Sequence, residues 1–260
     1  MQGKVWLIGG TSDSAQIAEV LAVSGLPLVI SVTTATAKAL YVNTALVSVG
    51  CMDNLQMKEF CQQNGVRAII DASHPYAVAV SSEAIAVADR LNLPYLRYER
   101  KNYQSKSASI NPDVIELPSI EHLVAGDYLA NQRILLTIGC KALAKFKIWH
   151  DRATLYARVL PKVASLKMAI AAGFTSDRLI AIRPPINAAT ETALWQQWRI
   201  SLVVTKASGK AGGEDIKRQV AASLGIPLIV ITRPRITYPN QTSEIKDILA
   251  FCRRAINFPN

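Results

Sequence analysis

One stretch near the start of the chain decides the fold: Lys4-Val5-Trp6-Leu7-Ile8-Gly9-Gly10-Thr11-Ser12-Asp13-Ser14-Ala15. Its first residues are mostly apolar and predict a buried strand, and the two glycines that follow predict a tight turn. Apolar residues then recur at helical spacing until Gly25, so a helix is expected over residues 12–24. A strand, a glycine turn and a helix in this order begin a Rossmann-like α/β fold.

The same alternation of strands and helices continues along the chain and predicts parallel sheets. Strands are expected over 4–9, 28–33, 67–71, 94–98, 133–138, 154–160, 179–182, 201–205 and 228–232, and helices over 12–24, 55–64, 76–91, 161–172, 188–198, 213–224 and 243–255. We therefore expect an α/β protein with two Rossmann-like lobes, each a parallel sheet flanked by helices, and a ligand cleft between them. The polar, proline-punctuated stretch 101–118 is the expected linker between an N-terminal dinucleotide-binding lobe (1–100) and a C-terminal basic lobe (119–260).

The composition excludes several classes of protein. The chain has 260 residues, of which 50% are hydrophobic and 18% charged, and its mean hydropathy is +0.19. These values allow a buried core and are unlike those of a disordered chain. No apolar run approaches the ~20 residues that span a bilayer, and the N-terminus predicts a strand instead of a signal peptide, so we expect a cytoplasmic protein that does not bind a membrane.

The net charge of +10 is unevenly distributed. Residues 1–96 carry 5 Lys and Arg against 7 Asp and Glu, whereas the remainder carries 24 against 12. A positive field of this size suits an anionic partner. Because the cations form no tract and few aromatic residues lie among them, a small or medium-sized anionic ligand is favoured over nucleic acid.

The cysteines and histidines show no spacing typical of metal ligands, so neither a zinc site nor a disulfide framework is expected. The four cysteines are expected to be reduced and mostly buried. These residues are Cys51, Cys61, Cys140, Cys252, His74, His122 and His150.

The glycine turn is the first candidate site. Gly9 and Gly10 would let the backbone approach a phosphate, and the helix that follows would offer its unpaired N–H groups, with a hydroxyl from Thr11 or Ser12. Ser14 stands where a full dinucleotide motif has a third glycine. A turn with a purely structural role is the alternative.

The end of the second expected strand bears on the choice of cofactor. It carries hydroxyls such as that of Thr33, then Lys38, and no acidic residue before Asp53. An acid at this place is typical of NAD sites and a cation of NADP sites, so NADP is favoured if a dinucleotide binds. A surface lysine without a ligand is the alternative interpretation.

A polar cluster, Asp71-Ala72-Ser73-His74-Pro75-Tyr76-Ala77, follows the third core strand. Ligands of α/β proteins bind at this edge of the sheet. His74 could polarise or protonate a ligand there, while Ser73 could cap the helix or bind an amide. The alternative is that Ser73 and Pro75 only start the helix and that His74 is an ordinary loop residue.

Cations and glycines at later strand ends are further candidates for binding an anion. Arg97 and Arg100 could hold carboxylates, unless Glu99 pairs with either of them. The stretch Thr205-Lys206-Ala207-Ser208-Gly209-Lys210-Ala211-Gly212-Gly213 is a second glycine-rich turn, although it lacks the order of a P-loop.

Together these motifs resemble the precorrin-6A reductase and cobalt-precorrin-6A reductase family of cobalamin biosynthesis. The resemblance covers nearly the whole chain. It is carried by Ile8-Gly9-Gly10-Thr11, Asp71-Ala72-Ser73-His74-Pro75-Tyr76-Ala77, Leu96-Arg97-Tyr98-Glu99-Arg100, Leu136-Thr137-Ile138-Gly139, Arg158-Val159-Leu160-Pro161, Arg183-Pro184-Pro185, Thr205-Lys206-Ala207-Ser208-Gly209 and Ile231-Thr232-Arg233-Pro234.

The resemblance implies an NADPH-dependent oxidoreductase that reduces one C=C bond of the precorrin-6A or cobalt-precorrin-6A macrocycle to give precorrin-6B. Its substrate would be a tetrapyrrole rich in carboxylates, which a basic lobe would suit, and neighbouring pathway enzymes would be candidate partners. The implied cofactor-binding residues are Gly9, Gly10, Thr11, Ser12, Thr33, Lys38 and Ser73; the implied catalytic residues are His74, Tyr76 and Lys206; the implied substrate-binding residues are Arg97, Arg100, Thr137, Arg183, Ser208 and Gly209; no metal ligand is implied. The chain departs from the family pattern at Lys101, at Gly50-Cys51-Met52, which is given no role, and at Pro185.

Two alternatives remain open from the sequence. The first is another NADP-dependent reductase on the same scaffold. The second is a non-enzymatic basic protein that binds RNA or an anionic metabolite, whose binding would depend strongly on salt.

Overall fold

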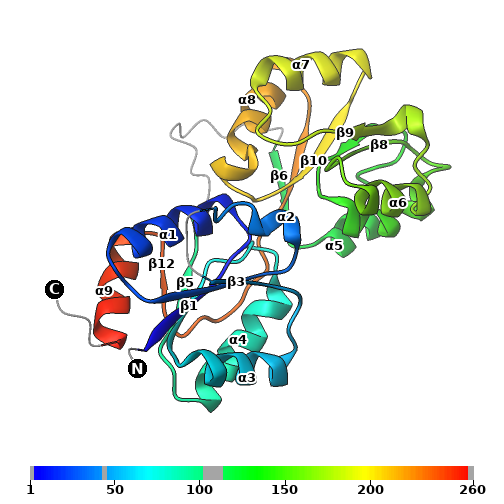
Figure 1. Ribbon diagram of the computed structural model, residues 1–260. Coiled ribbons are helices and arrows are strands. Elements are labelled where there is room, and N and C mark those ends of the chain that lie inside the picture. The colour runs from blue at the N-terminus through cyan, green and yellow to red at the C-terminus, as the bar shows by residue number, and fades with distance from the viewer. Residues whose placement is uncertain (1–2, 43–45, 102–113, 257–260) are drawn as a thin grey trace. The chain divides into compact units, whose positions relative to one another are not determined.

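The structure, a computed structural model, describes residues 3–42, 46–101 and 114–256. Its strands form two six-stranded sheets, A and B, in which the paired strands run parallel (Figure 1). The chain divides into two compact units: unit 1 comprises Met1–Lys101 and Arg235–Asn260, and unit 2 comprises Asn102–Pro234. The expectation of two parallel-sheet α/β lobes is confirmed.

Sheet A belongs to unit 1 and has the strand order of a Rossmann fold. Its strands, in sheet order, are β12 (Gln241–Thr242), β5 (Tyr95–Tyr98), β4 (Val66–Asp71), β1 (Lys4–Ile8), β2 (Leu28–Val32) and β3 (Leu46–Val49). The chain thus moves outward from β1 in one direction and then from β4 in the other. This reversal places the topological switch point between β1 and β4, where ligands of doubly wound sheets bind.

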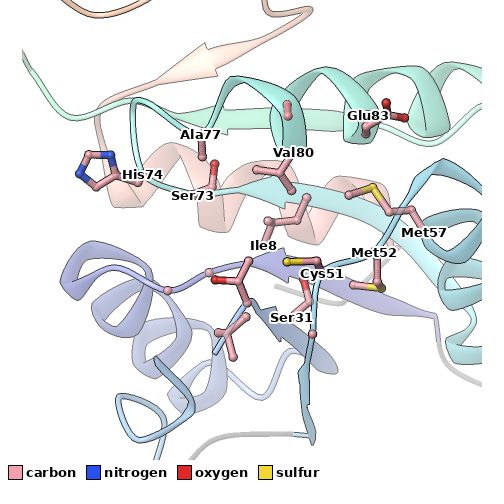
Figure 2. Close-up of a pocket in the computed structure, with 16 residues that line it drawn as sticks. Ile8, Ser31, Cys51, Met52, Met57, Ser73, His74, Ala77, Val80 and Glu83 are labelled. Atoms are coloured by element: carbon pink, nitrogen blue, oxygen red, sulfur yellow. The ribbon is translucent and has the colours of Figure 1, made fainter. Parts of the chain in front are cut away.

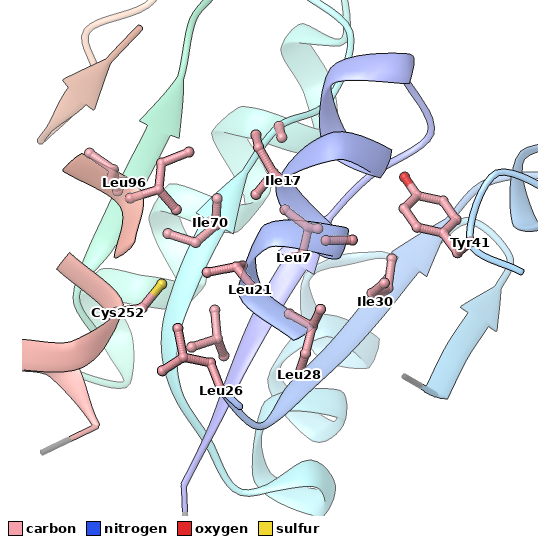
Figure 3. Packing of buried hydrophobic residues seen from close by; sticks show 14 of the residues in the cluster. Leu7, Ile17, Leu21, Leu26, Leu28, Ile30, Tyr41, Ile70, Leu96 and Cys252 are labelled. Carbon is pink, nitrogen blue, oxygen red and sulfur yellow. The ribbon is translucent and has the colours of Figure 1, made fainter. Parts of the chain in front are cut away.

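Helices cover both faces of sheet A because its strands alternate apolar side chains to either side. The helices are α1 (Ser12–Val23), α2 (Ala35–Lys38), α3 (Asn54–Asn64), α4 (Val78–Arg90) and α9 (Ile245–Ala255). One face carries Leu7 beside Leu21 of α1 and Cys252 of α9 (Figure 3). The opposite face carries Trp6 and packs against α3 and α4.

Sheet B repeats the same order in unit 2. Its strands, in sheet order, are β6 (Val114–Leu117), β11 (Leu228–Ile231), β10 (Leu202–Lys206), β7 (Arg133–Leu136), β8 (Thr154–Val159) and β9 (Leu179–Ala181). Its helices are α5 (Ile120–Ala125), the 3₁₀ segment η1 (Cys140–Trp149), α6 (Val163–Ala171), η2 (Ser176–Arg178), α7 (Ala188–Gln197), η3 (Lys210–Gly212) and α8 (Glu214–Leu224). The switch point of sheet B therefore lies between β7 and β10.

Sheet A takes one of its edge strands, β12, from beyond the strands of sheet B along the chain, whereas the strands of sheet B are consecutive. β6 precedes the rest of sheet B but follows β5, whereas β12 follows β11 and pairs with β5. The expected continuous lobe over 119–260 is therefore wrong for its last part, because β12 and α9 complete the sheet and core of unit 1.

The expected linker over 101–118 is also corrected in part. Val114–Leu117 is a strand that pairs with β11, since its residues are apolar enough to extend a parallel sheet. Residues 102–113 of that linker lie outside the described residues.

Charge is divided less sharply between the two units than between residues 1–96 and the remainder of the sequence. Unit 2 contains 17 Lys and Arg and 9 Asp and Glu, a net charge of +8, whereas unit 1 contains 12 and 10, a net charge of +2. Within the described part of the chain, no helix is long and apolar enough to cross a membrane.

Candidate functional site

Unit 1 contains a cavity of about 320 Å³ at the switch point of sheet A. Its floor is the carboxyl end of β1, and two of its walls are the turn after β1 and the loop after β4. Ile8 and Asp71, the last residues of these strands, are partners in the sheet register. The turn and the loop therefore leave the sheet side by side, which is why residues 60 positions apart share one pocket.

Five of the expected site residues line this cavity: Gly9, Gly10, Thr33, Ser73 and His74. Figure 2 shows His74 at one end of the cavity and Met57 and Glu83 toward the other. The remaining lining residues are Ile8, Ser31, Val32, Gly50, Cys51, Met52, Met57, Ala77, Ala79, Val80 and Glu83. Most of these side chains are apolar. The cavity therefore has a non-polar surface on which a flat ring could pack, and this surface lies beside the polar backbone of the turn at Gly9 and Gly10.

The glycine turn is held by a tyrosine that sequence analysis gave no role. The Tyr41 hydroxyl accepts a hydrogen bond from the Gly10 N–H at 2.7 Å and lies 2.7 Å from the Ser14 hydroxyl. A Cβ atom on Gly9 would lie 2.3 Å from that hydroxyl. The glycine at position 9 is therefore required by close packing against Tyr41.

Thr11 begins α1 as its N-cap. Its hydroxyl accepts from the Ser14 N–H at 3.0 Å, and the Ser14 hydroxyl accepts from the Thr11 N–H at 2.9 Å. This reciprocal capping box satisfies two backbone donors at the start of the helix. Ser12 is exposed at the first position of α1, where helix geometry leaves a backbone N–H without an intrahelical acceptor.

A buried polar network lies behind the loop that follows β4. The Asp71 carboxylate is fully buried and accepts hydrogen bonds from the Ser81 hydroxyl at 2.6 Å and the Tyr95 hydroxyl at 2.7 Å. It also accepts from the Ser73 N–H at 3.0 Å and pairs with Arg97 at 2.9 Å. Burial, with Asp71 adding to it, raises the pKa of Tyr95, which keeps its hydroxyl a donor.

The location of Arg97 does not fit the expected contact with substrate. Its side chain is 1% exposed, and its guanidinium binds Asp71, the Ser73 hydroxyl at 3.0 Å and Glu99 at 2.9 Å. Arg97 instead fixes the backbone of the loop that carries Ser73 into the cavity. Sequence analysis foresaw a pairing with Glu99 but not with Asp71.

Arg100 is likewise held within unit 1. Its guanidinium forms an ion pair with Asp13 of α1 at 2.8 Å. The pair neutralises an acidic side chain in the first turn of the helix that follows the glycine turn. The negative charge of Asp13 is therefore balanced by Arg100, so Asp13 does not repel an anion that binds at the N-terminus of α1.

His74 and Tyr76 lie together in the loop after β4. The Tyr76 N–H donates to His74 Nδ1 at 3.2 Å, and the two rings are 5.8 Å apart. With Nδ1 acting as an acceptor, the neutral imidazole carries its proton on Nε2. His74 is exposed and lines the cavity, whereas Tyr76 is half-buried and is not among the described residues that line it.

Lys38 lies beside the cavity rather than in it. It ends the short helix α2, whose N-cap is Thr34, the residue after Thr33. The side chain is exposed, and Lys38 is absent from the described residues that line the cavity.

The switch point of sheet B gathers the expected residues of unit 2. Thr137 follows β7, and its N–H and hydroxyl both donate to the Val204 carbonyl of β10, at 2.8 and 3.0 Å. Lys206 ends β10, and Ser208 and Gly209 follow it. Burial lowers the pKa of the Lys206 ammonium, as does the charge of Lys141.

Arg183 stands apart from this group. It is exposed and follows β9, the edge strand, with β8 lying between β9 and β7. The structure thus does not bring Arg183 to the same point of sheet B as Thr137 and Ser208.

The cysteines and histidines form no metal cluster among the described residues. All four cysteines are free; Cys61 and Cys252 are buried, as expected, and burial raises the pKa of each thiol to about 12. Cys51 is exposed, against the expectation, because it lies in the loop after β3 that lines the cavity.

The fold and the cavity together define a class of protein. Two doubly wound parallel sheets, one with a glycine turn and a cavity at its switch point, are characteristic of α/β proteins that bind their ligand at the carboxyl ends of the strands. The sequence profile of the family described as "Precorrin-6x reductase CbiJ/CobK" matches residues 4–253, and the chain belongs to this family. It is therefore an oxidoreductase of cobalamin biosynthesis.

Individual relatives agree over nearly their whole length. The chain is 44% identical to a cobalt-precorrin-6A reductase of Synechocystis sp., covering 96% of each chain. It is 32% identical to a protein of the same name from Priestia megaterium, covering 94% of this chain and 96% of that one. The solved structure of CobK precorrin-6A reductase superposes with a TM-score of 0.80 over 97% of each chain at 22% identity, which supports the fold.

Proposed function

We propose that this protein reduces one C=C bond of cobalt-precorrin-6A with a hydride from NADPH. The observation that carries the proposal is the cavity where Gly9 and Gly10 meet Ser73 and His74 at the switch point of sheet A. Relatives named cobalt-precorrin-6A reductase at 44% and 32% identity support this substrate over the cobalt-free macrocycle.

The residues present at the cavity fit a dinucleotide. A volume of about 320 Å³ lies within the range of small-molecule pockets. Met52, Met57 and Val80 offer apolar contact to an aromatic base, and the turn at Gly10 with the exposed start of α1 at Ser12 offers backbone donors to the pyrophosphate. When bound, the dihydronicotinamide supplies the hydride.

Lys38 is proposed to bind the 2′-phosphate that distinguishes NADPH from NADH. Its place on α2, just beyond the Thr33 wall of the cavity, supports this role. Lys38→Ala is expected to raise the Kd for NADPH about five-fold, since an exposed charge–charge contact contributes about 1 kcal/mol, and to leave the Kd for NADH unchanged. Lys246→Ala, which removes an exposed charge from α9 of the same unit, is the control. Equal loss of affinity for both cofactors would contradict the role of Lys38.

The carboxyl edge of sheet B is proposed to bind the macrocycle. Thr137, Lys206, Ser208 and Gly209 lie at its switch point, in the unit with a net charge of +8. Acetate and propionate side chains of a tetrapyrrole would find hydroxyl, ammonium and backbone donors there. Burial lowers the pKa of the Lys206 ammonium in this set.

A proton must reach the carbon next to the one that accepts the hydride. His74 is the proposed donor, since its exposed ring lines the cavity and its Nδ1 accepts from Tyr76 N–H, which leaves Nε2 as the acidic position. Tyr76 would then orient the ring. His74→Gln should lower kcat and leave NADPH affinity intact; a kcat within two-fold of the unmodified protein would assign the proton to Lys206 or water.

The test of the reaction is anaerobic oxidation of NADPH, followed at 340 nm, with cobalt-precorrin-6A, precorrin-6A and NADH as comparisons. Turnover with cobalt-precorrin-6A and NADPH, and little with NADH, is expected. NADPH binding without turnover of either macrocycle would assign the protein to another reductase reaction. Absence of dinucleotide binding, with salt-dependent binding of RNA, would overturn the proposal.

A further inference from the structure

The turn that follows β10 in unit 2 is held by buried charged side chains. This turn, residues 207–213, connects β10 to α8 and carries Ser208 and Gly209. Gly209 and Gly213 have φ angles of +65° and +67°, a conformation that side chains other than glycine seldom adopt. Backbone hydrogen bonds within the turn run from the Gly212 N–H to the Gly209 carbonyl and from the Gly213 N–H to the Lys210 carbonyl. Charged side chains add further contacts at both of its ends.

Lys217 fixes the far end of the turn. Its side chain is 3% exposed, and its ammonium donates to the Gly212 carbonyl and to the Gly213 carbonyl, each at 3.0 Å. Both acceptors are main-chain atoms of the turn. The ammonium thus closes the end of the turn onto the first part of α8.

Glu214 fixes the near end. Its carboxylate is 2% exposed and accepts from the Gly209 N–H at 2.8 Å, while Arg218 donates to its other oxygen at 2.9 Å. Arg233, from the segment after β11, donates to the Ala207 carbonyl at 2.8 Å. The main chain of the turn is therefore held at both ends by charged side chains.

The turn is also closely packed onto Ser208. A Cβ atom on Gly212 would lie 2.0 Å from the Ser208 hydroxyl oxygen. The main chain at Gly212 is therefore packed directly against Ser208, which places one of the two acceptors of Lys217 beside a residue at the switch point.

The surroundings of Lys217 do not make its ammonium a source of stability. Burial, with the charge of Arg158 of β8 adding to it, lowers the pKa of Lys217 to about 8, against the opposing effect of Glu191 of α7 and of Glu214 and Asp215 of α8. Arg158 and Glu191 are already paired with each other at 2.6 Å. Burying an ammonium group away from a paired carboxylate lowers the stability of the folded protein. The contribution of Lys217 is therefore to fix the conformation of the turn.

We infer that Lys217 is a positioning residue for binding of the carboxylate-bearing macrocycle, acting through the shape of residues 207–213. This inference rests on the proposed function, in which the edge of sheet B receives the substrate. Lys217 itself is covered by the turn and does not contact substrate; its ammonium holds Gly212 and Gly213 so that Ser208 and the main chain of Gly209 keep a fixed position.

The test compares Lys217→Met, Lys217→Arg and the control Lys167→Met in the full-length protein, with KM for cobalt-precorrin-6A, kcat and Kd for NADPH measured from pH 6.5 to 9. Lys167 is exposed on α6 in the same unit, so its loss matches the change in net charge. Lys217→Met is expected to raise KM about ten-fold, as for loss of hydrogen bonds from a charged donor, with NADPH affinity unchanged. Lys167→Met should remain within two-fold of the unmodified protein.

The pH profile separates positioning from a merely structural role. KM of the unmodified protein should rise as the pH passes 8, where the Lys217 ammonium loses its proton. Lys217→Arg keeps its charge over this range, so its KM should rise less than that of the unmodified protein. Identical pH profiles of KM in these two proteins would overturn the inference, even if Lys217→Met failed to fold. Turnover by the unmodified protein tests the proposed function separately.

Discussion

The contact between Gly9 and Tyr41 yields a prediction that can be worked through in numbers. In Gly9→Ala the new methyl group would lie 2.3 Å from the Tyr41 hydroxyl, so the tyrosine must move. Tyr41 is 5% exposed, and overpacking at such a site costs about 1–3 kcal/mol. The movement also breaks the hydroxyl's contacts with Gly10 and Ser14, each contributing about 0.5–1.5 kcal/mol. The expected loss of stability is about 2–6 kcal/mol.

Removing the hydroxyl first should remove most of that cost. In a Tyr41→Phe background the nearest atom to the methyl group would be Cζ, at 3.1 Å, which a small shift of the ring can relieve. Tyr41→Phe by itself should cost about 1–2 kcal/mol, because water can reach the exposed Gly10 N–H. Gly9→Ala should then add about 1 kcal/mol or less, so the double-mutant cycle should give a coupling of about 1–5 kcal/mol.

Hydrogen exchange measured by mass spectrometry is the suitable assay, because peptides that cover β1 and β2 report the stability of unit 1 alone. Urea-dependent exchange of these peptides in the four proteins gives the cycle directly. If Gly9→Ala lost the same free energy with and without the Tyr41 hydroxyl, the steric explanation of the glycine would be refuted. A Kd for NADPH measured on the same four proteins should follow the same pattern.

Three further predictions concern the buried charges and the turn after β10. Arg97→Met leaves the Asp71 carboxylate buried without its cation, so urea unfolding of unit 1 should show a loss of about 3–5 kcal/mol; a loss below about 1 kcal/mol would contradict this. Gly212→Ala drives a methyl group to 2.0 Å from the Ser208 oxygen, so KM for the macrocycle should rise while Kd for NADPH stays constant; a parallel rise in both would argue against a local effect. Burial lowers the pKa of Lys217 to about 8, so between pH 8 and its ordinary value of 10.5 the unfolded chain binds a proton that the folded chain does not. Unfolding free energy of the unmodified protein should therefore rise with pH relative to Lys217→Met in that window, and a falling difference would refute the direction of the shift.

Much of the fold was predictable because its signals are local. The glycine turn at Gly9 and Gly10, the alternation of strands and helices, and the polar residues after β4 are all readable within about ten positions. Three of the four edge strands, β12, β3 and β6, were missed. β12 has two residues, too few for a period to show. Which sheet a strand joins depends on its distant partners, so the placement of β12 and α9 in unit 1 had no signal in their own residues.

The site was predictable only where its residues stand at strand ends. Ser73 and His74 were predicted as site residues because polar side chains at the carboxyl edge of a parallel sheet are typical of ligand binding. Tyr41 was missed because its hydroxyl acts on a turn 31 positions away. Arg97 was assigned to the substrate because a sequence shows its charge but not its burial beside Asp71. Lys217 was missed because a lysine on an amphipathic helix is usually exposed.

The return of the chain to unit 1 has a consequence for the order in which the protein is made. A ribosome that has synthesised every strand of sheet B has still not delivered Ile248 and Cys252, which cover one face of sheet A. Until they emerge, that face exposes Leu21, Ile70 and Leu96. The unit whose residues come first is therefore the last to close, and a nascent chain carries an open apolar surface throughout translation of unit 2. Chaperones that bind apolar surface should associate with this polypeptide longest at its N-terminal part, and a truncation before α9 should expose the face permanently.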